Sequence, residues 1–478
     1  MSNRHKFLIG GQWRTSDELI EVRFPYTNEV IGEVYLASDK DLEDAVTLAE
    51  RGFQITRKLP SHRRSAILRR LQELMMARAE ELAHVLTMEG GKALKTSRGE
   101  VERAQQTVLI SSEEARRIGG EIIPIDWTPA GENRIGLVRR FPLGPVLGIT
   151  PFNYPLNLAC HKVAPAIAAG NSIVLKPASA TPLSALLLAE MILEAGFPPE
   201  AISVVPTPGA RAEQLVRDER FKCLTFTGSS EVGWHLRTLA GRKRVALELG
   251  GNAAVIIHED ADIPYAVSRC VMGAFTNAGQ NCISVQRILI HEPVWDEVVH
   301  RLIEATKALR VGDPRDEQTD IGPMIDERAA RRAESWLQEA VEQGAKILYG
   351  GQRDGVMMQP TILTNVRPDM KVSCQEVFAP LVVVSPYQDF DEAICMANQT
   401  EYGLQGGLFT QDIHRIMKAF EEFEVGGLQV NDVSTFRVDH MPYGGVKASG
   451  LGREGPRYAI EEMTELKLLV INLGGGKS

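Results

Sequence analysis

The chain has 478 residues, of which 44% are hydrophobic and 24% are charged. This length exceeds one ordinary domain, and the composition is typical of a globular protein that buries two or three large cores. The net charge of −9, from 53 basic and 62 acidic residues, argues against nucleic acid or an anionic membrane as the main partner.

The six cysteines are scattered along the chain, without a Cys-x-x-Cys pair or a Cys/His cluster at the spacing of metal ligands. This distribution argues against a metal site and against a disulfide framework, and it is typical of a reducing cytosol. The N-terminal residues lack the apolar stretch of a signal peptide, and no apolar run of about 18 residues predicts a transmembrane helix. We therefore expect a cytoplasmic protein that does not span a membrane.

The first part of the chain combines short strands with two helices. Alternating apolar residues predict strands at 6–9, 21–24 and 30–34. Ser38 and Asp41 have the spacing of a helix cap, so a helix is expected to begin directly after Ser38. A second, longer helix is predicted from Ser61, with apolar side chains on one face as far as Leu82, and this stripe is typical of a buried core.

From about residue 143, short apolar runs rich in β-branched residues alternate with helical stretches. The predicted strands of this region are 145–149, 172–175, 201–205 and 223–226. Such alternation predicts a parallel sheet with helices on both faces, the doubly wound design of nucleotide-binding domains. Further strands, predicted at 253–257, 287–290 and 381–384, indicate a second α/β domain.

Three segments contain the groups that chemistry on a carbonyl requires. Cys282 lies in Gly-Gln-Asn-Cys-Ile, Glu248 in Leu-Glu-Leu-Gly-Gly, and Asn153 in Thr-Pro-Phe-Asn-Tyr-Pro. A thiol can attack a carbonyl carbon, a carboxamide N–H can hold the oxyanion that forms, and a carboxylate can activate water to release the product. The alternative for Asn153 is that it only caps the following helix, as asparagine often does.

These three motifs, together with segment 431–455, resemble the aldehyde dehydrogenase superfamily, and the resemblance covers nearly the whole chain. It implies that Cys282 is the nucleophile that forms a thiohemiacetal, that Asn153 holds the oxyanion, and that Glu248 is the base for hydrolysis of the thioester. Family members that pass the acyl group to coenzyme A typically lack this glutamate. Its presence therefore implies a free acid product.

The resemblance also implies the aldehyde dehydrogenase fold, which is of the α/β class. A Rossmann-like cofactor domain is expected from residues 1–119 and 143–249, and an α/β catalytic domain from residues 250–446. The extended segment 120–142 and the C-terminal strand within 457–478 are expected to form the oligomerisation element. In the family such a hairpin and tail pair between subunits, so we expect a homo-oligomer, either a dimer or a tetramer.

The segment from Phe226 to Gly233 follows a predicted strand and opens a predicted helix, so its backbone N–H groups could face a pyrophosphate. Alone this signal is weak, because any strand–turn–helix corner would explain its glycines. Within the family it borders the cofactor, NADP or NAD. The resemblance implies that the following residues bind this cofactor: Ile149, Thr150, Pro151, Phe152, Lys176, Ala178, Ser179, Gly209, Phe226, Gly228, Ser229, Val232, Leu249, Glu376 and Phe378.

Ser179 bears on the choice between the two cofactors. A carboxylate at this turn would accept hydrogen bonds from both ribose hydroxyls and repel a 2′-phosphate, which favours NAD. This chain has a neutral serine there, close to Lys176. We therefore expect NADP to be accepted, with dual use possible. The alternative is that Ser179 is only a turn residue and that selectivity is set elsewhere.

Arg437 and His161 are the candidate substrate contacts. In relatives that oxidise phosphorylated or phosphonylated aldehydes, an arginine near the position of Arg437 binds the anion, and the guanidinium fork suits such oxyanions. The alternatives are a surface ion pair for Arg437 and a hydrogen-bonded helix histidine for His161. Asn281 precedes the nucleophile where several anion-binding relatives have arginine, which argues against a strongly phosphate-specific pocket.

The resemblance is greatest to the small-aldehyde branch of the family, the lactaldehyde and non-phosphorylating glyceraldehyde-3-phosphate dehydrogenases. It implies NAD(P)-dependent oxidation of a small hydroxylated or anionic aldehyde to its acid, with succinate semialdehyde as the alternative substrate. Two alternatives belong to other classes. One is a structural protein that reuses the fold, as some lens crystallins do. The other is a thioester or ester hydrolase without redox chemistry, which would leave the segments around Lys176 and Glu376 without a role.

Overall fold

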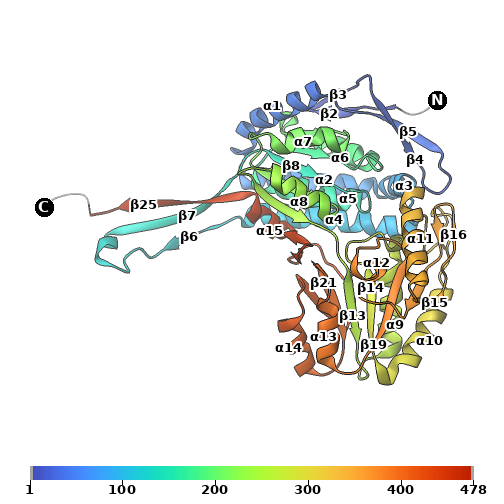
Figure 1. The fold of residues 1–478 in the computed structure, drawn as a ribbon. Helices are drawn as coiled ribbons and strands as arrows, with labels where there is room; N and C mark the ends of the chain where they lie inside the picture. Colours follow the sequence, from blue (N-terminus) through green and yellow to red (C-terminus); the bar gives the residue numbers. More distant parts are fainter. Residues whose placement is uncertain (1–3, 475–478) are drawn as a thin grey trace.

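The computed structural model describes residues 4–474, so the last four residues of the expected oligomerisation element lie outside it. Two α/β bodies, built on an eight-stranded and a seven-stranded sheet, lie one above the other, and a thin three-stranded arm projects to one side (Figure 1). Within residues 4–474, no helix is long and apolar enough to cross a membrane.

The eight-stranded sheet has the order β24-β12-β11-β8-β9-β10-β2-β3, and its five central strands are parallel. This sheet confirms the predicted doubly wound design. Its parallel strands are β8 (Val146–Ile149), β9 (Ile173–Lys176), β10 (Ile202–Val204), β11 (Cys223–Thr227) and β12 (Arg244–Glu248). Its antiparallel strands are β2 (Phe7–Ile9) and the two edge strands β3 (Gln12–Arg14) and β24 (Gly450–Leu451).

Helices cover both faces of this sheet, because alternate side chains along each strand enter two separate cores. One face packs against α2 (Ser61–Ala77), α3 (Ala79–Gly90), α4 (Leu94–Arg117), α5 (Pro155–Ala169) and α6 (Leu183–Glu194). The other face packs against α1 (Asp39–Thr56), α7 (Gly209–Arg217) and α8 (Ser230–Leu239). The predicted cap of α1 is confirmed, since Ser38 and Asp41 bond reciprocally.

The single long helix predicted from Ser61 to Leu82 is wrong, because the structure divides it into α2 and α3. At Arg78 the backbone leaves the helical region, with φ −113° and ψ 25°. The guanidinium of Arg78 bonds Glu81 in the first turn of α3 at 2.7 Å, which stabilises the new start. Leu82 is nevertheless buried in the same core.

The seven-stranded sheet has the order β15-β18-β19-β14-β13-β21-β22, and all its pairs except β15–β18 are parallel. Its strands are β13 (Ala253–Ile257), β14 (Val285–His291), β15 (Lys346–Tyr349), β18 (Thr361–Thr364), β19 (Leu381–Tyr387), β21 (Gln405–Phe409) and β22 (Gly427–Val430). The helices of this part are α9 (Ile263–Phe275), α10 (Trp295–Lys307), α11 (Glu327–Glu342), α12 (Lys371–Cys374), α13 (Phe390–Asn398) and α14 (Ile413–Glu422). Helix α15 (Pro456–Glu462) packs instead against α4 and α5 of the first body.

Short strands complete the described chain: β1 (Arg4–His5), β4 (Leu19–Arg23), β5 (Val30–Tyr35), β16 (Arg353–Asp354), β17 (Met357–Met358), β20 (Tyr402–Gly403) and β23 (Val446–Lys447). The arm consists of β6 (Gly120–Ile123), β7 (Arg134–Pro142) and the C-terminal β25 (Thr464–Asn472) (Figure 1).

The C-terminal strand finds its partner within the same chain. β25 pairs with β7 along its whole length, from Thr464 opposite Pro142 to Asn472 opposite Arg134. Pairing with another subunit is therefore not needed to complete the hairpin and tail. Leu466, Leu468 and Leu469 of the arm are each more than half exposed. Exposed apolar side chains of this kind mark interaction surfaces, and the homo-oligomer stays a prediction.

Candidate active site

Two cavities meet at Cys282. The larger has a volume of about 770 Å³ and opens at the carboxyl ends of the parallel strands of the eight-stranded sheet, against α11 of the other body. The smaller has a volume of about 270 Å³. Cys282, Asn153 and Leu158 line both cavities. A group attached to the sulfur can therefore contact a ligand on either side.

A sharp turn after α9 brings Cys282 to this junction. Asn277, Ala278 and Gly279 all adopt left-handed backbone angles, with φ between 53° and 68°. At Gly279 a Cβ atom would lie 2.1 Å from the carbonyl oxygen of Ala379, so only glycine fits. Such strain is common where a fold fixes a functional side chain.

The sulfur of Cys282 lies 3.1 Å from the hydroxyl of Tyr443. Burial raises the pKa of the Cys282 thiol to about 11, while the Tyr443 hydroxyl, which can donate to a thiolate, opposes this shift. The thiol is therefore mostly protonated at neutral pH and needs a base before it can attack. Tyr443 lies in the C-terminal motif, but its contact with the sulfur is not visible from the sequence.

Asn153 does not cap α5. The carboxylate of Glu100 does so, accepting hydrogen bonds from the N–H groups of Leu156 at 3.0 Å and Asn157 at 3.1 Å. The Asn153 amide instead donates to the carbonyl oxygen of Gln280 at 3.1 Å. This bond uses one of its two N–H groups, and the other remains for a ligand beside Cys282.

Glu248, the last residue of β12, lines the larger cavity. Both of its carboxylate oxygens are buried, and neither has a hydrogen-bond partner among residues 4–474. Burial, together with repulsion from the Glu454 carboxylate, raises the pKa of Glu248 well above its usual value. A buried carboxyl group with a raised pKa and no partner is a candidate for proton transfer.

The predicted cofactor residues divide into two groups. The larger cavity is lined by Pro151, Phe152, Ala178, Ser179, Gly228, Ser229, Leu249, Glu376 and Phe378. Outside its lining lie Ile149, Thr150, Lys176, Gly209, Phe226 and Val232. Two of these contact a residue that lines the cavity. The ring of Phe226 would lie 2.5 Å from a Cβ at Gly228, and the N–H of Val232 donates to Ser229, which caps α8.

Two charged groups stand out among the predicted cofactor residues. Lys176, at the end of β9, is 8% exposed, and its ammonium group forms no hydrogen bond or ion pair with another described residue; burial lowers its pKa to about 8. Burial raises the pKa of Glu376 to about 7, although its carboxylate accepts a hydrogen bond from Gly251 N–H at 3.0 Å. At Gly250 a Cβ atom would lie 2.3 Å from this carboxylate, which explains the glycine.

The smaller cavity has a basic wall. Arg103, Arg269 and Arg437 line it, and no carboxylate is among its described lining residues. Arg103 bonds Asp439 at 2.8 Å, and Arg269 bonds Asp432 at 2.7 Å. Arg103 and Arg269 are not predicted from the sequence, because single arginines on helices α4 and α9 resemble ordinary surface cations.

Arg437 is neither a surface ion pair nor a free anion ligand. Its side chain is 5% exposed, and its Nη2 bonds Glu454 at 2.9 Å and contacts His161 at 3.1 Å. Its guanidinium also lies 3.7 Å from the centre of the Tyr443 ring. One edge of Arg437 still reaches the smaller cavity.

His161 does not line either of the two cavities at Cys282. It is 1% exposed and bonds Asp439 at 2.9 Å, behind the arginines. The prediction that His161 contacts the substrate is therefore not supported. Its position matches the alternative, a hydrogen-bonded helix histidine.

The structure also brings His258, Glu259 and His291 together at the ends of β13 and β14, a grouping that the sequence spacing does not reveal. His258 Nδ1 accepts a hydrogen bond from Glu259 N–H at 2.7 Å, so its lone pair is already used. This hydrogen bond makes His258 less available as a metal ligand and argues against a metal site in this cluster. The absence of a metal remains a prediction.

The model of the aldehyde dehydrogenase family matches residues 13–469. The chain belongs to the aldehyde dehydrogenase family. It is 50% identical over 466 residues to 3-sulfolactaldehyde dehydrogenase of Priestia megaterium, with 97% of each chain covered. This confirms the family and the enzyme class expected from the motifs.

Solved aldehyde dehydrogenase structures confirm the fold. Aldehyde dehydrogenase 21 of Physcomitrella patens, in complex with the reaction product succinate, has a TM-score of 0.98 at 42% identity, with 99% of each chain covered. Glyceraldehyde-3-phosphate dehydrogenase GapN of Methanocaldococcus jannaschii, complexed with NADP, has a TM-score of 0.92 at 39% identity. That match covers 96% of this chain and 99% of the other.

Proposed function

We propose that this aldehyde dehydrogenase oxidises a small anionic aldehyde of the 3-sulfolactaldehyde type to its carboxylic acid, with NADP or NAD as hydride acceptor. The observation that carries the proposal is the position of Cys282 between a cavity that suits a dinucleotide and a small cavity walled by arginines. The 50% identity to a 3-sulfolactaldehyde dehydrogenase supports this substrate class.

The residues of the larger cavity suit the cofactor. The Glu376 carboxylate could accept hydrogen bonds from ribose hydroxyls, and the N-terminus of α8 could face the pyrophosphate. Lys176, without a partner among the described residues, and the neutral Ser179 support acceptance of a 2′-phosphate. When bound, the nicotinamide accepts a hydride from the substrate carbon.

The residues around Cys282 supply the other steps. The thiol first transfers its proton to a base. The candidate is the Glu248 carboxylate, which has no hydrogen-bond partner among the described residues. The sulfur then attacks the aldehyde carbon. The free N–H of Asn153 and the main-chain N–H of Cys282 hold the oxygen that becomes negative. Loss of hydride leaves a thioester on Cys282. After Glu248 has passed the thiol proton to solvent, it takes a proton from the water that attacks this thioester, and it returns that proton to the sulfur as the carboxylic acid is released.

Arg103 and Arg269 are the candidate ligands of the substrate anion. Arg103 bonds Asp439 through Nε and Nη2, which leaves Nη1 without a partner among the described residues. Arg269 bonds Asp432 through Nε only. The side chains of Arg103 and Arg269 are 32% and 21% exposed, whereas that of Arg437 is only 5% exposed. The volume of about 270 Å³ limits the substrate to a few carbon atoms.

Succinate semialdehyde is the second candidate substrate. The relative from Physcomitrella patens was crystallised with succinate, and the same arginines could bind a carboxylate. Lactaldehyde lacks an anionic group and would leave the basic wall unused.

A substrate panel with the purified enzyme and NADP tests the proposal. We expect kcat/KM for 3-sulfolactaldehyde to exceed that for lactaldehyde by at least about tenfold, the effect of one charge-assisted hydrogen bond. Arg103→Gln and Arg269→Gln should remove this preference. Arg98→Gln, an exposed arginine on the same helix as Arg103, is the matched control and should not. A preference for lactaldehyde, or equal losses for neutral and anionic aldehydes, would contradict the proposal.

A further inference from the structure

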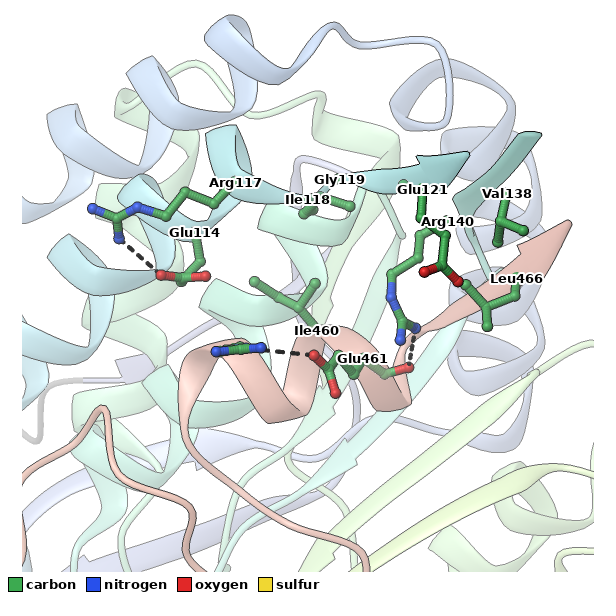
Figure 2. Close-up of a pocket in the computed structure, with 12 residues that line it drawn as sticks. Glu114, Arg117, Ile118, Gly119, Glu121, Val138, Arg140, Ile460, Glu461 and Leu466 are labelled. Atoms are coloured by element: carbon green, nitrogen blue, oxygen red, sulfur yellow. Dashed lines mark hydrogen bonds and ion pairs between the residues drawn. The ribbon is translucent and has the colours of Figure 1, made fainter. Parts of the chain in front are cut away.

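A third cavity, of about 630 Å³, lies at the base of the arm. It is formed by the loop before α2, the last residue of α5 and the end of β7. The 15-residue α5 begins beside Asn153, so this cavity lies roughly 20 Å from the active site along the helix axis. A neighbouring hollow shares Ile118, Gly119, Gly120 and Arg140 with it. Figure 2 shows this hollow, with Arg140 reaching toward the carbonyl oxygen of Glu461 on α15.

The third cavity is lined by basic residues without acidic partners. Its cationic lining residues are Arg57, Lys58, Arg64, Arg139 and Arg140. No aspartate or glutamate is among its described lining residues, and none of the five cations forms an ion pair with a described carboxylate. Five positive charges that form no ion pair among the described residues line one hollow and repel each other, and three carboxylates, those of Glu114, Glu121 and Glu461, line the neighbouring hollow. An anion in the hollow would relieve this repulsion.

Most of the donors in this cavity are free. The Arg64 guanidinium donates through Nη1 to the carbonyl oxygen of Ala168 at 2.7 Å, but its buried Nε has no described partner. Arg140 donates to the hydroxyl of Thr464 at 3.3 Å. The side chains of Arg57, Lys58 and Arg139 form no hydrogen bond with a described residue, although Arg57 and Arg139 lie over phenylalanine rings.

The start of α2 adds to the positive potential. Pro60 precedes the helix and provides no side-chain cap, and the first turn contains no acidic residue. Pro60 and Ser61 both line the cavity. The first N–H groups of α2 therefore face a space that already holds the basic side chains.

We propose that this cavity binds a small anion that carries a phosphate group, at a site separate from catalysis. Arginine forks and helix N-termini are the groups with which proteins bind phosphate, and here both converge on one hollow. The volume exceeds that of a bare phosphate, which indicates a phosphate monoester or a diphosphate. Because α2, α5 and β7 all contribute, the bound anion holds the arm against the cofactor-binding body.

Calorimetric titration of the full-length enzyme with inorganic phosphate and pyrophosphate tests the proposal. The titration is run at constant ionic strength without NADP, because NADP itself carries a phosphate monoester and a diphosphate that would compete for the cavity. We expect saturable binding that weakens by at least about tenfold in Arg57→Gln/Arg139→Gln, which loses two charged donors. The matched control is Arg63→Gln/Arg116→Gln. These exposed arginines, on α2 and α4, do not line the cavity, and binding should stay unchanged. Lys58→Met, a change at an exposed side chain, is a second variant that should weaken binding.

Three results would overturn the proposal. The first is an absence of saturable binding to the wild-type enzyme. The second is equal weakening in the control double variant, which would indicate general electrostatic attraction. The third is a lower molar mass of Arg57→Gln/Arg139→Gln in light scattering, with no phosphate binding to the wild type, which would identify the basic cavity as a contact between subunits.

Discussion

The buried carboxylate of Glu100 has two roles: it forms an ion pair, and it caps α5, the helix that begins just after Asn153. This carboxylate is 1% exposed, caps α5 through the N–H groups of Leu156 and Asn157, and pairs with the ammonium group of Lys92, which is 2% exposed. Replacing this carboxylate with an amide leaves the shape almost unchanged and removes the charge. We predict that Glu100→Gln destabilises the enzyme far more than its size suggests.

The magnitude follows from the two roles of the carboxylate. Removing one partner of a buried ion pair costs about 3–5 kcal/mol, because the other charge is left without compensation. Losing a negative charge at a helix N-terminus adds about 0.3–1 kcal/mol. Burial already lowers the pKa of Lys92, so the unpaired ammonium group can release its proton and avoid part of this cost. We therefore expect a loss of about 3 kcal/mol, at the lower end of the range.

Urea unfolding of Glu100→Gln and Glu102→Gln provides the measurement. Glu102 lies on the same helix and is exposed, so its substitution should change the unfolding free energy by less than about 0.5 kcal/mol. The double variant Lys92→Met/Glu100→Leu replaces the pair with apolar side chains and should recover most of the loss. If Glu100→Gln were as stable as Glu102→Gln, the buried pair would contribute nothing and the reasoning would fail.

Four further predictions concern catalysis. Glu248→Gln removes the proposed base for both the thiol and the hydrolytic water, so the first-turnover formation of NADPH in stopped-flow absorbance and the steady-state rate should each fall by about 10²- to 10⁴-fold; unchanged rates would contradict its role as base. Because burial raises the pKa of the Cys282 thiol to about 11, alkylation by iodoacetamide should still accelerate with pH above pH 9. Tyr443→Phe removes the hydrogen bond that lowers this pKa and should slow alkylation at fixed pH. Lys176→Met should raise KM for NADP about tenfold more than KM for NAD, and equal increases would show that Lys176 does not bind the 2′-phosphate.

The candidate catalytic residues could be predicted because each lies in a short contiguous motif. Glu248 ends a buried strand and Cys282 follows a turn that requires glycine, so a few neighbouring residues determine the position of each. Arg103 and Arg269 could not be predicted in this way. The partner of Arg103 is Asp439, 336 residues further along the chain, and no local pattern on α4 indicates this pairing.

The same physical limit explains the other errors of the sequence analysis. The sequence motif indicates that Arg437 is important, but it does not reveal the contacts of Arg437 with Glu454 and His161. These contacts depend on how α5 packs against the C-terminal segment. The break between α2 and α3 occurs at Arg78 without a proline or glycine, and the ion pair of Arg78 with Glu81 lies beside it. The apolar periodicity continues across the break, so it gives no signal there.

The carboxylates behind the basic wall bear on which anion the enzyme selects. Asp439, Asp432 and Glu454 each bond one of the three arginines, so most of the positive charge of the wall is already compensated. Attraction between net charges is then weak, and binding of an anion depends on the few N–H groups that remain free, such as Nη1 of Arg103. Such a wall can hold the single charge of a sulfonate or a carboxylate. It does not supply the second positive charge that a phosphate dianion needs, and Asn281 beside Cys282 does not provide it either. We therefore expect 3-sulfolactaldehyde and succinate semialdehyde to be better substrates than glyceraldehyde 3-phosphate.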